Sequence, residues 1–69
     1  MGKYLYTWHW STGGGNQVWA DTEEQAIESA KAVSSRLCLV YPIAVTNLRR
    51  VGERGDKAVD RYFDSISRD

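Results

Sequence analysis

The chain has 69 residues, 42% of them hydrophobic and 26% charged, and its nine basic and nine acidic side chains give a net charge of zero. This length predicts one small domain over residues 1–69, because so short a chain buries only about 60% of its unfolded surface. Little room remains for a deep substrate pocket, so we expect no enzymatic activity, no small-molecule substrate and no cofactor. Neutrality also excludes a uniformly basic surface that would bind nucleic acid by releasing counterions.

Charge is divided mildly between the two halves of the chain. Residues 1–35 contain two lysines and four acidic residues, whereas residues 36–69 contain seven basic and five acidic residues, so the halves carry −2 and +2. The second half is therefore the one expected to attract an acidic partner.

The fold must be stabilised by packing, because the sequence provides neither a pair of cysteines for a disulfide nor the ligands of a structural metal site. Cys38 is the only cysteine and His9 the only histidine. We therefore expect no internal disulfide and no structural zinc site, which needs four ligands. No apolar run approaches the roughly 18 residues that span a bilayer, and the N-terminus lacks the apolar core of a signal peptide. These features predict a cytoplasmic protein without membrane contact.

The first two strands are expected to form a hairpin. Residues 3–11 alternate with period two and are rich in aromatic and β-branched side chains, which is typical of a strand. Residues 12–16 contain three consecutive glycines and predict the hairpin connection. Residues 17–20 then predict a short returning strand.

The first helix is predicted to begin at Asp21 or Thr22 and to end near Arg36. Either residue can cap the N-terminus, and Glu24 or Gln25 completes a capping box. An apolar stripe at spacings of three and four is expected to face the sheet: Ala26, Ile27, Ala30, Val33 and Leu37. The small alanines would let this helix approach a sheet that carries bulky aromatic side chains.

A third strand and a second helix complete the predicted fold. Because Pro42 cannot donate a ladder hydrogen bond, the strand is expected after it, at residues 43–49. Residues 52–55 interrupt the chain, and Asp56 can cap a helix. In that helix, apolar side chains follow the spacing i, i+3, i+4, i+7: Val59, Tyr62, Phe63 and Ile66. The order ββαβα predicts a single α+β domain of two layers, its third strand antiparallel.

The residues that could carry chemistry form no catalytic group. Residues 13–15 precede a strand, so they predict a hairpin tip and not a phosphate-binding loop, which needs a following helix. His9 has no neighbour in the sequence that would orient or activate it. Cys38 borders two apolar stretches and is expected to be a small buried side chain.

Aromatic side chains on one face of the first strand have two interpretations. The face consists of Tyr4, Tyr6, Trp8 and Trp10. It could stack on the bases of single-stranded nucleic acid, or it could pack against the alanine-rich helix. Because Lys3 is the only basic residue of the hairpin, we favour packing. Trp10 lies near the hairpin tip and is the member expected to be partly exposed, as an anchor for a partner.

Arg49, Arg50 and Arg54 form the only dense basic cluster. Consecutive strand residues point to opposite faces, so at least one of Arg49 and Arg50 should be exposed. The cluster is either a solvated strand end or a hot spot for an acidic partner or a phosphate group.

Residues 18–30, VWADTEEQAIESA, join an aromatic strand to an acidic, alanine-rich helix, and residues 45–49, VTNLR, form an arginine-bearing strand. Together they resemble the small host RNA polymerase inhibitors of short-tailed coliphages, in which two arginines two residues apart on the third strand bind the polymerase. The resemblance places one arginine at Arg49 and the other at Asn47, with Arg50 as the replacement cation. It covers residues 4–51 and not the second helix.

Several small anti-CRISPR proteins that bind type I surveillance complexes are similar in size and order of elements. Both resemblances imply a phage protein that acts in the bacterial host cytosol. It would take over host function by blocking a large nucleoprotein or polymerase complex, without catalysing a reaction. The residues expected to contact this partner are Arg49, Arg50, Arg54, Trp10 and Asn47. The alternatives are a single-stranded nucleic-acid binder that uses the aromatic strand face, and a module that forms homodimers through an open sheet edge.

Overall fold

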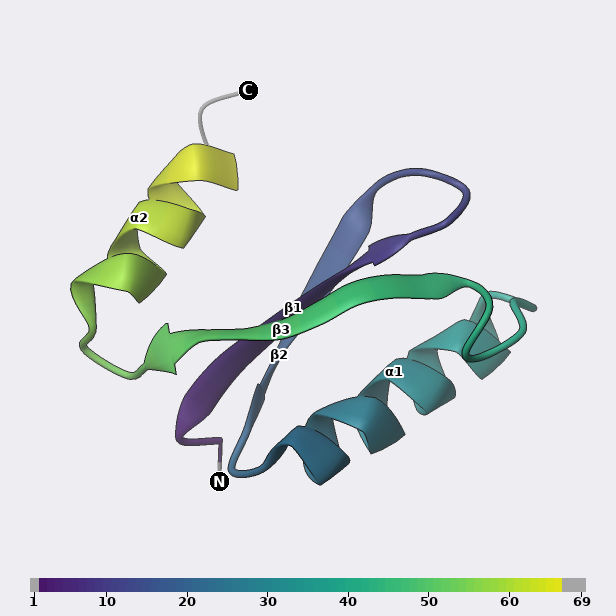
Figure 1. The fold of residues 1–69 in the computed structure, drawn as a ribbon, viewed down its shortest axis with the longest axis horizontal. Coiled ribbons are helices and arrows are strands. Elements are labelled where there is room, and N and C mark those ends of the chain that lie inside the picture. The colour runs from purple at the N-terminus through teal and green to yellow at the C-terminus, as the bar shows by residue number, and fades with distance from the viewer. Residues whose placement is uncertain (1, 67–69) are drawn as a thin grey trace.

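Strands and helices follow one another in the order expected from the sequence. The computed structural model describes residues 2–66. Its elements are β1 (Tyr4–Trp10), β2 (Gly15–Ala20), α1 (Glu23–Arg36), β3 (Val45–Glu53) and α2 (Lys57–Ile66) (Figure 1). The predicted α+β fold with the order ββαβα is confirmed. β1 is the central strand and pairs antiparallel with β2 on one side and with β3 on the other.

Glycines at the hairpin tip let the chain reverse between β1 and β2. Gly13 and Gly14 have φ values of 111° and 81°, which are disfavoured for residues with a Cβ atom. The Trp10 N–H donates to the Gly14 carbonyl at 2.9 Å and closes the loop. The two strands then pair in one register without a bulge. The predicted hairpin is confirmed, with β2 beginning at Gly15 instead of Gln17.

β3 differs most from the strand that was expected at residues 43–49. The Val45 N–H donates to the Pro42 carbonyl at 3.0 Å, which holds a turn ahead of the strand and delays its start to Val45. The strand was expected to end at Arg49, but Gly52 still pairs with Leu5 of β1 and β3 continues one residue beyond it. The prediction therefore missed the second half of β3.

Two irregularities in the pairing of β1 with β3 bend this edge strand. At the first irregularity, Val51 is an extra residue of β3 that has no partner in β1. At the second, Asn47 and Leu48 of β3 lie opposite the single residue Trp8 of β1. Asn47 adopts the left-handed conformation, with φ of 55°, which asparagine tolerates better than most residues. Leu48 packs against the core beside α1. Bulges of this kind hinder the pairing of a free edge with another strand.

α1 is capped as the sequence predicts. Thr22 Oγ1 accepts a hydrogen bond from the Gln25 N–H at 3.2 Å, and Gln25 Oε1 accepts one from the Asp21 N–H at 2.9 Å. The buried stripe is narrower than expected and consists of Ala26, Ala30 and Ser34. Leu37, which was expected on this stripe, is 53% exposed because α1 ends at Arg36 and the chain turns away.

One face of β1 packs against α1. Tyr6 and Trp8 are only 6% and 1% exposed, and Tyr6 forms a buried cluster with Ala26 of α1 and Ala20 of β2. The packing interpretation of the aromatic face is confirmed for these two rings. Burial leaves Trp8 Nε1 without a hydrogen-bond partner among the described residues.

α2 covers the opposite face of the sheet. The hydroxyl groups of Tyr62 and Thr7 are hydrogen-bonded at 2.9 Å, and the rings of Phe63 and Trp19 are stacked with centroids 6.5 Å apart. Val59 is 4% exposed, as its place in the predicted apolar pattern requires. The side chain of Ile66, the last member of that pattern, lies outside the described residues.

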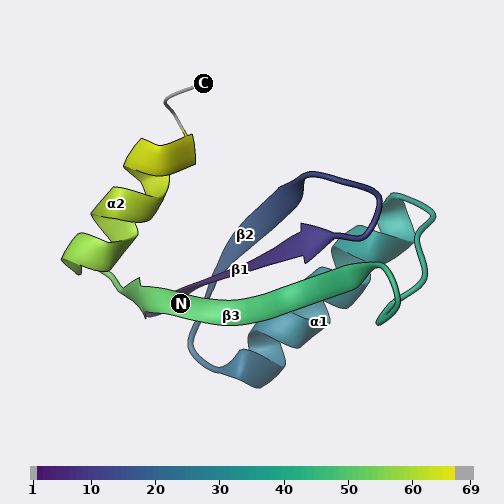
Figure 2. The same cartoon turned by 45° about the horizontal axis from the view of Figure 1, so that its top comes forward.

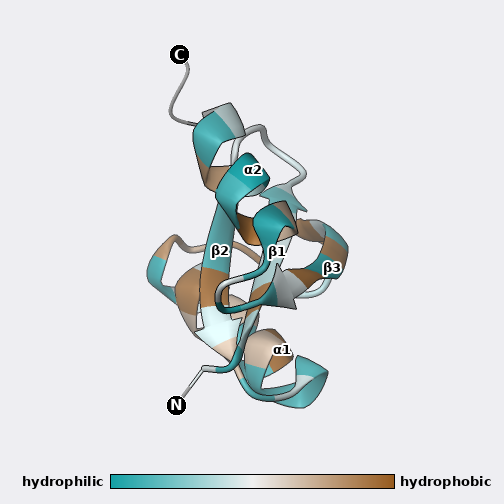
Figure 3. Cartoon of the chain, turned by 90° about the vertical axis from the view of Figure 1, so that its left-hand side faces the viewer, coloured by the Kyte–Doolittle hydropathy of each residue, from teal (hydrophilic) through white to brown (hydrophobic). Residues whose placement is uncertain are grey.

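The sheet therefore lies between two helices that are well apart from each other (Figures 2 and 3). The sequence predicted two layers, and the structure has a helix on each face. Leu5 and Thr7 are 0% and 3% exposed, because α2 covers the face of β1 that the first helix leaves open. Asp56 caps α2 as predicted, since its Oδ1 accepts a hydrogen bond from the Ala58 N–H at 3.2 Å.

Candidate partner-binding surface along β3

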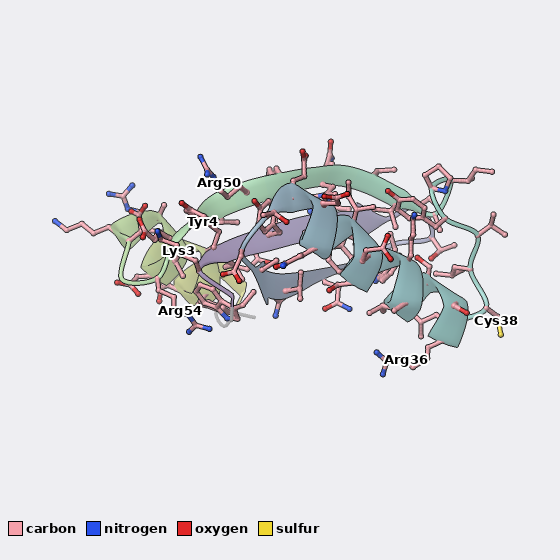
Figure 4. The ribbon with its side chains drawn as sticks, turned by 90° about the horizontal axis from the view of Figure 1, so that it is seen from below. Lys3, Tyr4, Arg36, Cys38, Arg50 and Arg54 are labelled. Atoms are coloured by element: carbon pink, nitrogen blue, oxygen red, sulfur yellow. The ribbon has the colours of Figure 1, made fainter. Side chains whose placement is uncertain are left out.

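Arg49 and Arg50 lie in the middle of β3 and project to opposite faces of the sheet. The register places Arg49 opposite Thr7 on the α2 face and Arg50 opposite Tyr6 on the α1 face. Both residues are exposed, which agrees with the expectation that at least one of them would be. Arg50 Cζ lies 4.8 Å from the centre of the Tyr4 ring, and its guanidinium group extends away from the sheet (Figure 4).

Asn47, the position that the coliphage resemblance pairs with Arg49, lies on a β3 bulge. Its Nδ2 donates to His9 Nδ1 at 3.4 Å, on the face that also carries Arg49. Arg50 leaves the strand on the other face. It therefore does not substitute for a cation at position 47 in the same orientation, and the geometry departs from the side-by-side arginines that the resemblance implies.

Arg54 is held by the fold. Its Nε donates to the Gly2 carbonyl at 2.8 Å, and its guanidinium carbon lies 4.0 Å from the centre of the Trp19 ring. These contacts tie the turn after β3 to the start of the chain and to β2. Of the three arginines in the predicted cluster, Arg54 is thus the one with structural contacts on both sides of its guanidinium group.

Trp10 is half-buried, in agreement with the expectation that it would be partly exposed. Its ring meets Trp8 edge to face, with centroids 5.6 Å apart. Tyr4 is half-buried as well. Only these two members of the aromatic face keep accessible surface, because Tyr6 and Trp8 are covered. A stack of several bases along this face, as the nucleic-acid alternative requires, has no room beneath α1.

Among the described side chains, the exposed large apolar ones lie in the loop between α1 and β3, where none was expected. Leu37, Val40 and Ile43 are 53%, 65% and 76% exposed. Cys38, which was predicted to be buried, is exposed in the same loop with φ of 59° (Figure 4). Sequence reasoning missed this group because Ile43 was assigned to the strand. The signal in the sequence that could have indicated this loop was the interruption of the apolar run by Pro42.

We name these features together the β3 surface, which consists of Leu37, Val40, Ile43, Arg49 and Arg50. At about 3.3 Å per residue, Ile43 and Arg49 lie within about 20 Å of each other along the chain. That distance fits within one side of a standard interface of about 800 Å². The β3 surface thus offers exposed apolar groups at one end and two cations at the other.

Within residues 2–66, no group of three or more His, Cys, Asp or Glu side chains is arranged to hold a metal ion. No helix in the same part of the chain is long and apolar enough to cross a bilayer. Comparison with known proteins finds no matching family model, no similar curated sequence and no similar solved structure.

Proposed function

We propose that this protein is a non-enzymatic inhibitor that binds an acidic surface of a host nucleic-acid-processing complex through the β3 surface. The observation that carries the proposal is the pair of exposed arginines, Arg49 and Arg50, on the two faces of one edge strand. Within the described residues β3 pairs with β1 alone, so a partner that approaches the other edge of β3 meets both guanidinium groups. Arginine is enriched among residues that dominate binding energy at protein interfaces.

The chemistry of the two arginines suits carboxylates. A guanidinium group can form two parallel charge-assisted hydrogen bonds with one carboxylate. The Tyr4 ring supports Arg50 from one side, which restricts the side chain in advance and leaves its N–H groups free. Neither guanidinium group has an ion pair or hydrogen bond within the described part of the chain, so no such bond has to be broken on binding.

The apolar loop supplies the complementary part of an interface. Exposed apolar groups that gather in one segment are typical of protein-binding surfaces. Burying Val40 and Ile43 against a partner would remove apolar area from water, worth about 25 cal/mol per Å² before the costs of association. We propose that this end provides affinity and that the arginines provide orientation and partner choice.

Capture from a bacterial host lysate tests the proposal. Immobilised wild-type protein is expected to retain a large polymerase or surveillance complex, identified by mass spectrometry. The double variant Arg49→Glu/Arg50→Glu is expected to lose it, because the reversed charges repel an acidic partner, while the free energy of unfolding changes by less than about 1 kcal/mol. Arg36→Glu reverses an exposed arginine of α1 and serves as the matched control that keeps the complex.

Two outcomes would count against the proposal. Retention of the complex by the double variant would show that β3 is not the binding surface, and unfolding of that variant would show that the arginines are structural. A labelled single-stranded oligonucleotide provides the parallel test of the nucleic-acid alternative. Tight binding that weakens steeply with salt and is lost in Trp10→Ala would favour that alternative instead.

A further inference from the structure

A second surface lies on the α2 face of the sheet, where two adjoining hollows follow α2. The larger, about 430 Å³, is lined by residues of β1, β2, β3 and α2, including His9, Gln17 and Arg49. The smaller, about 340 Å³, lies between β3 and α2 and is lined by Arg49 and Arg61. Both hollows share Arg49, Tyr62 and Ser65. We call the two hollows together the α2 trough.

The lining of the α2 trough is cationic although the protein as a whole is neutral. Among the residues that the structure describes, no aspartate or glutamate lines either hollow. Asp60 is two residues from Tyr62, about 200° around the helix, and so lies on the opposite side of α2. Asp64 lies three residues after Arg61, beside it on the helix surface, and lines neither hollow. By contrast, the hollow beside Arg50 on the other side of β3 is also lined by Glu53 and Asp56, which balance its charge.

The α2 trough also has more hydrogen-bond donors than acceptors. Each guanidinium group carries five N–H donors, and the guanidinium groups of Arg49 and Arg61 form no hydrogen bond or ion pair within residues 2–66. The acceptor Gln17 Oε1 is already approached by the Tyr62 hydroxyl at 3.3 Å. These donors on two neighbouring elements are therefore available to a ligand that supplies acceptors.

We propose that the α2 trough binds a phosphate group, free or as a monoester, with Arg49 of β3 and Arg61 of α2 as its two cationic contacts. A tetrahedral dianion presents oxygens in several directions and can accept hydrogen bonds from guanidinium groups on two different elements. A planar carboxylate is matched by a single guanidinium group. The Ser65 hydroxyl lies on the shared wall and can donate as well, whereas the one proton of the Tyr62 hydroxyl is used in its contacts with Thr7 and Gln17.

The group can come from free phosphate or from a small phosphorylated molecule. The hollows fall within the range of about 300–1,000 Å³ that is typical of small-ligand sites, which leaves space for an organic group attached to the phosphate. Nuclear magnetic resonance titration of ¹⁵N-labelled protein with inorganic phosphate and with a nucleoside 5′-monophosphate, at constant ionic strength, tests both sources. Tighter binding of the nucleotide would identify the monoester as the source, and equal binding would identify the free ion.

We expect saturable shifts confined to amide signals of the trough, such as those of Thr7, Gln17 and Ser65. Arg49→Gln and Arg61→Gln should each weaken binding about tenfold or more, because each removes charge-assisted hydrogen bonds. Arg36→Gln, which neutralises an exposed arginine on α1 at the other face of the sheet, should leave binding unchanged. Shifts that do not saturate, or an equal loss in Arg36→Gln, would overturn the proposal.

Arg61 separates this site from the β3 surface, because Arg49 belongs to both. Arg61 is exposed on a helix, so Arg61→Gln tests the site even if Arg49→Gln fails to fold. Arg61→Gln should bind phosphate about tenfold or more weakly and still capture the host complex. In the wild-type protein, phosphate binding without capture would overturn only the docking function, and capture without phosphate binding would overturn only the trough.

Discussion

At the scale of single residues, three arginines of one short segment have different surroundings. Arg54 donates to the Gly2 carbonyl and stacks on Trp19, whereas Arg49 and Arg50 extend into solvent from opposite faces of β3. The backbone decides the difference, since Arg54 is the first residue after the strand and its side chain turns back toward the N-terminus. Residue type alone does not distinguish a binding arginine from a structural one.

We predict that Arg54→Ala lowers the free energy of unfolding by about 1–2 kcal/mol, because it removes a part-buried hydrogen bond and a cation–π contact. Arg49→Ala, a control in the same segment, should change it by less than about 0.5 kcal/mol. Urea denaturation followed by tryptophan fluorescence measures both. Equal, small effects would show that the contacts of Arg54 contribute nothing to stability.

At the scale of elements, the spacing between α1 and the sheet depends on side-chain size. Ala26 and Ala30 are both 0% exposed, and Ser34 is 1% exposed, with its Oγ donating to the Ala30 carbonyl at 2.8 Å. These small groups allow the helix to lie close to a face that carries Tyr6 and Trp8. The buried serine satisfies its own hydroxyl within the helix, so a polar residue fits the stripe where an apolar one was expected.

Ala30→Leu is expected to destabilise the protein by about 1–3 kcal/mol, because the larger side chain must push α1 away from the sheet. Ala32→Leu makes the same chemical change on the exposed side of the same helix and should be close to neutral. Thermal unfolding followed by circular dichroism compares the two variants. If both were tolerated equally, α1 would not be packed closely against the aromatic face.

At the scale of the whole molecule, α2 joins parts of the chain that are far apart in sequence. Tyr62 reaches Thr7 of β1 and Gln17 of β2, and Thr7 Oγ1 in turn donates to the Asn16 carbonyl at 2.9 Å. This small network connects the C-terminal helix with the hairpin. It also forms one wall of the α2 trough, so the helix that completes the core creates the second candidate site.

Tyr62→Phe is expected to lower the free energy of unfolding by about 0.5–1.5 kcal/mol, because it removes the hydroxyl group of this network and keeps the ring. Tyr41→Phe is the matched control, since no hydrogen bond of the Tyr41 hydroxyl exists within the described residues. Chemical denaturation monitored by circular dichroism gives both values. An unchanged stability of Tyr62→Phe would mean that α2 is held by its apolar contacts alone.

Local signals in the sequence were sufficient for several elements. The glycines predicted the hairpin, Thr22 and Gln25 predicted the cap of α1, and Asp56 predicted the cap of α2. Each of these depends on residues within a few positions of one another, so their physical chemistry can be evaluated without the fold. The alternation of faces on β3 likewise follows from strand geometry, which is why the exposure of Arg49 and Arg50 was foreseen in part.

The sequence by itself determined the order ββαβα, the caps, the hairpin and the exposure of an arginine on the third strand. Only the tertiary structure decided that α2 covers the second face of the sheet, that Ile43 and Cys38 are exposed, and that Arg54 is bound to Gly2. These depend on contacts between residues distant in sequence and on bulges that change the register of β3. Periodicity describes one element at a time, whereas burial depends on what packs against it.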